Sequence, residues 1–125
     1  MTKVLIVDDH ETIIDLIKHA LPKDRYEVLH TSDGSFVYEL AAELKPDLIL
    51  LDLMLPGLDG FNVQNKLLLG EATRDIPVLI MSSKTQVGEV FKTSDNVVGF
   101  MSKPFDLKEL VAKIEEIIAA RTKPV

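Results

Sequence analysis

The sequence has no cysteine and no excess of basic residues. The first absence excludes disulfides, zinc–thiolate sites and cysteine nucleophiles, and it fits the reducing cytoplasm where we expect the protein to work. With 14 basic and 20 acidic residues the formal net charge is −6. No basic cluster is evident, so we expect no direct contact with nucleic acid. No apolar run approaches the roughly 20 residues of a membrane span, and the apolar run at the start is too short for a signal peptide.

The 125 residues suffice for one domain, and 46% of them are apolar, enough to form a buried core. Composition gives no sign of disorder. We expect a single domain over residues 1–121, with 122–125 as a tail or the start of a linker.

Short apolar runs alternate with helical patterns along the whole chain. The runs cover 4–7, 27–30, 48–51, 78–81 and 97–101, and the helical patterns cover 12–21, 35–44, 59–69, 84–94 and 106–120. The first, third and fourth runs are continuously apolar, which is typical of parallel strands covered on both faces, whereas the second resembles an edge strand. Strand–helix alternation predicts an α/β fold, a doubly wound five-stranded parallel sheet with helices on both faces. We expect Asp106 to cap the last helix.

Polar residues follow the strands at the point where each strand ends. Asp8 and Asp9 follow the first run, Asp52 the third, Ser82 the fourth and Lys103 the fifth. Because ligands of doubly wound sheets bind at the carboxyl ends of the strands, we expect these five side chains to lie together. Three neighbouring carboxylates need a compensating cation, and with no thiolate available an oxygen-only site favours Mg²⁺. A central carboxylate can then act as a nucleophile towards phosphorus.

Each residue also has an ordinary structural explanation. Asp8 and Asp9 would serve as helix caps, and Ser82 and Lys103 as turn residues. Asp52 is the exception, because a charge at the end of a central apolar strand is costly unless it is paired. The coincidence of all five at one sheet edge therefore favours a functional site.

Four motifs in this order resemble the receiver domains of two-component response regulators, with the flavodoxin-like fold of chemotaxis regulators. They are VLIVDD at 4–9, DLMLPGLDG at 52–60, PVLIMS at 77–82 and FMSKPF at 100–105, so the resemblance spans essentially the whole chain. It implies a phosphoacceptor regulator that catalyses its own aspartyl phosphorylation and dephosphorylation, and is not otherwise an enzyme.

The resemblance also implies residue roles. Asp52 would accept the phosphoryl group, and Ser82 and Lys103 would contact it. The Mg²⁺ ligands would be Asp8, directly or through water, together with Asp9, Asp52 and the backbone carbonyl of Met54. Ser82 and Phe100 would form the switch, with an ordinary core position as the alternative for Phe100. His10 could extend the metal site, but we expect an exposed residue that opens the first helix.

The resemblance implies two kinds of partner. A sensor histidine kinase or phosphotransfer protein would supply the phosphoryl group. A downstream partner or output domain would bind the face formed by 84–94, 97–101 and 106–120, and a phosphorylation-dependent homodimer is a family expectation. The junction at 93–96 departs from the usual small-residue pattern of the family, within the region of this partner face.

Three other functions fit the sequence less well. A receiver used only for docking or dimerisation, independent of phosphorylation, is disfavoured because every residue that the chemistry needs is present. A metal-dependent phosphohydrolase would need a second acid close after Asp52, where Leu53 and Met54 stand. A flavin-binding protein would need a phosphate-binding loop rich in glycine, serine and threonine, which the sequence lacks.

Overall fold

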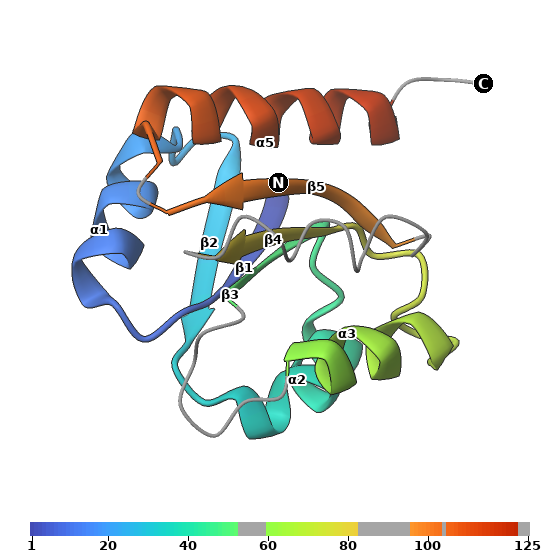
Figure 1. Cartoon of the computed structure of the whole chain (residues 1–125). Coiled ribbons are helices and arrows are strands. Elements are labelled where there is room, and N and C mark those ends of the chain that lie inside the picture. Colours follow the sequence, from blue (N-terminus) through green and yellow to red (C-terminus); the bar gives the residue numbers. More distant parts are fainter. Residues whose placement is uncertain (53–59, 83–95, 104, 123–125) are drawn as a thin grey trace.

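The computed structural model describes residues 1–52, 60–82, 96–103 and 105–122. Its five parallel strands form one sheet in the order β2-β1-β3-β4-β5 (Figure 1). The strands are β1 (Thr2–Val7), β2 (Tyr26–Thr31), β3 (Leu48–Asp52), β4 (Val78–Ser82) and β5 (Val97–Ser102). The predicted doubly wound parallel fold is confirmed, and β2 lies at an edge as its weaker apolar pattern indicated.

Helices cover both faces of the sheet (Figure 1). They are α1 (Glu11–Ala20), α2 (Val37–Leu44), α3 (Gly60–Leu69) and α5 (Leu107–Thr122), and a short 3₁₀ turn, η1 (Gly34–Phe36), precedes α2. The helix expected at 35–44 therefore begins later, because the Asp33 carboxylate accepts a hydrogen bond from the Ser35 N–H and caps the 3₁₀ turn instead. Asp106 accepts from the Lys108 N–H at 2.8 Å, the predicted cap of α5. The helix expected at 84–94 lies outside the described residues. Within the described part of the chain, no helix is long and apolar enough to cross a membrane.

Successive side chains of the central strands point to opposite faces of the sheet, and each face has its own hydrophobic core. On β3, Leu48 and Leu50 pack towards α1 and α5, while Ile49 and Leu51 pack towards α2 and α3. All five residues of β3, including Asp52, have no exposed surface. The strand that ends at Asp52 is therefore held on both faces, which fixes the position of its last carboxylate.

The pairing of β4 with β5 contains a register shift. Val78 lies opposite Val97, but Leu79 lies opposite Gly99, so Val98 has no partner in the register. Val98 is 40% exposed. Beyond the shift, Phe100 lies opposite Ile80 and is half-buried against the core beneath α2 and α3.

The ionisation of Tyr26 makes the stability of the fold depend on pH in the alkaline range. Burial raises the pKa of its phenol, and the nearby Glu115 carboxylate raises it further, against a smaller opposite effect of Arg25. The neutral phenol therefore stabilises the folded state fully below the unfolded pKa of about 10, and this stabilisation is lost as the pH rises through the higher folded value. We expect urea denaturation to show that wild type loses more stability than Tyr26→Phe between pH 9 and pH 11. Parallel loss in both proteins would contradict this assignment.

Candidate functional site

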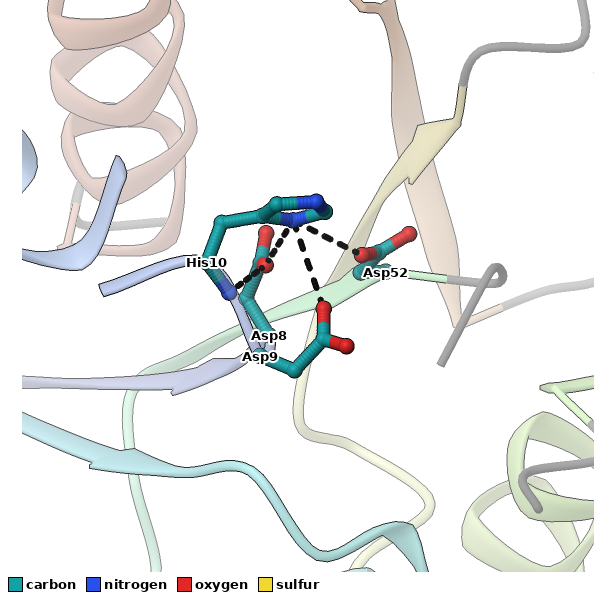
Figure 2. A group of neighbouring side chains, drawn as sticks. All are labelled: Asp8, Asp9, His10 and Asp52. Carbon is teal, nitrogen blue, oxygen red and sulfur yellow. Dashed lines mark hydrogen bonds and ion pairs between the residues drawn. The ribbon is translucent and has the colours of Figure 1, made fainter. Parts of the chain in front are cut away.

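The carboxyl ends of β1 and β3 bring three aspartates together. Asp8 follows β1 and Asp52 is the last residue of β3, and neither has exposed surface. Asp9, one residue further, has a side chain that is 36% exposed. Figure 2 shows the three carboxylates at this edge of the sheet. Neighbouring β1 and β3 are in register from Val4 and Leu48 to Val7 and Leu51, which explains why their next polar residues meet.

Lys103 joins the group from the turn after β5. Its ammonium Nζ donates to Asp8 Oδ2 at 2.8 Å and to Asp52 Oδ2 at 3.1 Å, and its side chain is only 13% exposed. A lysine inserted between two buried carboxylates offsets charge that would otherwise oppose folding. Burial raises the pKa of Asp8, but hydrogen bonds from Lys103 and His10 outweigh it, and the net pKa lies below the ordinary value.

His10 also belongs to this cluster. It occupies the position before α1, where its own backbone N–H donates to Asp8 Oδ1 at 2.8 Å. Its ring Nδ1 lies 2.8 Å from the same oxygen and 3.3 Å from Asp9 Oδ1 (Figure 2). The ring is 57% exposed, so the sequence-based expectation of an exposed residue at the helix start is correct. The sequence did not predict that the ring points towards Asp8 and Asp9, a direction set by the backbone hydrogen bond from His10 to Asp8.

The helix-capping explanation of the acidic pair does not fit the structure. His10, rather than an aspartate, precedes the first helical residue, and no side chain caps α1 there. The Asp8 carboxylate instead spans Lys103 and His10. A hollow of about 270 Å³ adjoins the acidic pair, and its lining includes Asp8, Asp9 and His30. Solvent therefore reaches the cluster from the side of α1 and β2.

The described residues include only part of the expected switch. Ser82 ends β4, next to Met81, but its side chain is outside the described residues, as are the whole of Met54 and the loop at 53–59. Phe100 lies on β5 with its side chain half-buried among Val97 and the residues beneath α2 and α3.

A buried polar contact that was not predicted from the sequence joins α3 to the residue before β5. Gln64 Nε2 on α3 donates to Asn96 Oδ1 at 2.6 Å, just before β5 begins, and both residues are buried. Gln64 lies three residues before the buried Leu67 on α3. This helical spacing places both residues on one face and is the signal in the sequence that Gln64 is buried.

The donor set fits a hard divalent cation. Three carboxylates and one ammonium carry a net charge of −2, which one divalent ion neutralises. Carboxylate oxygens are the ligands that Mg²⁺ prefers, alongside water and phosphate oxygens. The imidazole nitrogen of His10 is the one donor of the cluster that departs from this preference.

Comparison with known proteins identifies the architecture. Residues 4–115 match the family described as the response regulator receiver domain. The DNA-binding dual master transcriptional regulator RpaA of Synechocystis is 39% identical over 119 residues, which is 94% of this chain but 49% of the relative. The chain thus spans about half the length of this curated relative.

Solved receiver domains have the same fold. The non-phosphorylated HemR receiver domain of Leptospira biflexa is 28% identical with a TM-score of 0.85, covering 100% of this chain and 99% of that chain. The receiver domain of the Pseudomonas aeruginosa sensor histidine kinase PA1611, solved with magnesium coordinated in its active site cleft, is 24% identical. Its TM-score is 0.80, covering 94% of this chain and 98% of that one, and this likeness shows the fold. The chain belongs to the receiver domain family of two-component response regulators.

Proposed function

We propose that the protein is a phosphoacceptor switch that receives a phosphoryl group on Asp52 from a sensor histidine kinase or phosphotransfer protein. One observation carries the proposal: Asp52 ends the fully buried β3 strand beside two further carboxylates and the Lys103 ammonium. A buried acid in contact with a lysine, at the ligand-binding edge of a doubly wound sheet, has the surroundings of a functional group.

The proposed reaction is a direct phosphoryl transfer. A carboxylate oxygen of Asp52 forms a bond to phosphorus while the bond from phosphorus to the donor imidazole breaks, and the imidazole leaves with the electron pair. Lys103, 3.1 Å from Asp52 Oδ2, offsets negative charge on the transferring group. The β3 backbone, buried on both faces, orients the nucleophile. Hydrolysis of the acyl phosphate at the same residue returns the switch to its first state, so the domain catalyses both steps of its cycle.

The same site would hold Mg²⁺. Asp9, Asp52 and the Met54 carbonyl would be its ligands, with Asp8 contributing directly or through water. When bound, the ion would neutralise negative charge on the carboxylates and on the phosphoryl oxygens. The carboxylate-rich donor set supports this assignment, because Mg²⁺ binds oxygen donors.

The signal would leave through Ser82 and Phe100. The Ser82 hydroxyl would contact the phosphoryl group, and Phe100 would turn further inward as that hydroxyl moves. The half-buried position of Phe100 on β5 supports this role, because an aromatic ring near a surface can change its exposure without unfolding the core. A downstream partner or output domain would bind the face formed by 84–94, β5 and α5, and a phosphorylation-dependent homodimer would use the same kind of surface.

We take residues 1–121 as the functional unit, with the last residues as its tail or link. The expected setting is the cytoplasm, where sensor kinases present their phosphohistidine, with no direct contact to nucleic acid or membrane by this domain. The net charge of −6 supports this view, because a phosphate backbone would be repelled.

Intact mass spectrometry tests the proposal. Wild type incubated with Mg²⁺ and acetyl phosphate should gain one phosphoryl group, whereas Asp52→Asn, or wild type with a chelator, should gain none. The matched control is Asp75→Asn, which removes an exposed carboxylate just before β4, at the opposite edge of the sheet, and should still be phosphorylated. A folded wild type that gains no mass would instead favour a docking module that works without phosphorylation.

A further inference from the structure

The His10 ring directs a nitrogen donor at the acidic cluster. Its Nδ1 lies 2.8 Å from Asp8 Oδ1, 3.3 Å from Asp9 Oδ1 and 3.9 Å from Asp52 Oδ2 (Figure 2). The ring comes from the residue before α1, and its backbone hydrogen bond to Asp8 fixes the turn that places it there. Four potential ligand atoms of four residues therefore lie within 4.8 Å of one another.

These distances are those expected between neighbouring ligands of one metal ion. Zn²⁺ sites in proteins are mostly tetrahedral, and ligand bonds of about 2.1 Å at the tetrahedral angle separate adjacent donor atoms by about 3.4 Å. The separation of 3.3 Å from Nδ1 to Asp9 Oδ1 is close to this value, and the separation of 2.8 Å to Asp8 Oδ1, a hydrogen bond without metal, is somewhat shorter. The three donors could thus converge on one ion with only small movements.

The Lys103 ammonium is bonded to one oxygen of Asp8, and His10 is bonded to the other. The two oxygens of Asp8 are divided, with Oδ1 next to His10 and Oδ2 bonded to the Lys103 ammonium. The Lys103 Nζ also lies 3.5 Å from His10 Nδ1. An ion held by His10, Asp8 Oδ1 and Asp9 Oδ1 would therefore not need to displace the lysine from Asp8 Oδ2.

We propose that His10 Nδ1, with Asp8 Oδ1 and Asp9 Oδ1, forms a mixed nitrogen and oxygen site for a divalent transition metal such as Zn²⁺. Imidazole nitrogen favours Zn²⁺, Ni²⁺ and Cu²⁺, whereas Mg²⁺ favours oxygen. The inference rests on the metal site proposed above and deepens it: the carboxylates are shared, so Zn²⁺ and Mg²⁺ exclude each other. His10 would then make the domain sensitive to which metal is available.

Calorimetric titration of metal-free protein tests the proposal, with Zn²⁺ and Mg²⁺ added separately. His10→Ala should lower the Zn²⁺ affinity by about tenfold or more. Removal of a group that only supports a metal ligand already costs about tenfold, and loss of a ligand itself should cost at least as much. The Mg²⁺ affinity should stay almost unchanged, so the preference for Zn²⁺ falls by the same factor. In ¹⁵N-labelled wild type, the Nδ1 resonance of His10 should shift on addition of Zn²⁺.

The other two histidines provide matched controls. His19 is exposed on α1, with its Nδ1 2.7 Å from the Asp15 carbonyl oxygen, and His30 lines the hollow beside the acidic pair. His19→Ala and His30→Ala should both keep the Zn²⁺ affinity of wild type. A similar loss in either control, or an equal loss for both metals in His10→Ala, would overturn the proposal, as would unchanged Zn²⁺ binding.

The same preparations separate this inference from the proposed function. If Mg²⁺ supports phosphorylation of Asp52 but His10→Ala keeps its Zn²⁺ affinity, only the zinc site fails. If His10 carries Zn²⁺ selectivity in a protein that never gains a phosphoryl group, the phosphoacceptor function fails and the metal site stands.

Discussion

Replacement of Lys103 by alanine is expected to slow phosphorylation of Asp52 by about 10²- to 10³-fold, the loss typical of removing one preorganised charge-stabilising donor. The lysine ammonium lies 3.1 Å from Asp52 Oδ2 in surroundings that are mostly closed to water. An electrostatic contact in such surroundings is stronger than the same contact at the surface. The rate is measured by intact mass at fixed acetyl phosphate and Mg²⁺ concentrations.

The control for this experiment is Lys66→Ala. It removes the same charge from an exposed position on α3, outside the acidic cluster, and should leave the rate close to that of wild type. Circular dichroism establishes that Lys103→Ala is folded before its rate is compared. A folded Lys103→Ala protein that is phosphorylated as fast as Lys66→Ala would remove Lys103 from the proposed chemistry.

Leu50→Ala is expected to lower the free energy of unfolding by about 2–5 kcal/mol, because it leaves a cavity in a part of the core that is held on several sides. Leu50 has no exposed surface and lies on β3 between Ile6 of β1 and Leu79 of β4. Since small domains are stable by only about 5–15 kcal/mol, this single change removes a large share of the total. Urea denaturation measures it as a lower midpoint at an unchanged slope.

Leu16→Ala makes the same chemical change at an exposed position. Leu16 lies on the outer side of α1 with 50% of its surface exposed, so its loss should change stability by less than about 0.5 kcal/mol. Equal destabilisation by the two substitutions would mean that β3 does not form the rigid centre described above.

The sheet could be predicted because its signals are local. The continuously apolar runs that form β1, β3 and β4 are typical of strands covered on both faces, and Asp52 stood out because a charge directly followed such a run. The meeting of Asp8, Asp9, Asp52 and Lys103 then followed from parallel topology, which gathers strand ends at one edge. Their roles in phosphoryl transfer stay predictions.

Other features depend on details that a residue pattern does not contain. The direction of the His10 ring follows from a backbone hydrogen bond to Asp8. The contact of Gln64 with Asn96 joins positions 32 residues apart, each of which looked like an ordinary polar residue. The start of α2 was predicted too early because the Asp33 cap favours a 3₁₀ turn, a local competition that apolar periodicity does not reveal.

The register shift in β5 has a consequence for how this strand can change in evolution. Side chains of a regular strand alternate between faces, so Val97 and Phe100, three positions apart, would belong to opposite layers. Both pack beneath α2 and α3, because the extra residue Val98 interrupts the alternation. Deletion of Val98 would place Val97 and Phe100 two positions apart, the spacing of one face in a regular strand, so Phe100 would stay beneath α2 and α3. This strand can therefore lose its extra residue in evolution and keep its two faces, whereas loss of a residue after the shift would exchange the faces of the residues that follow.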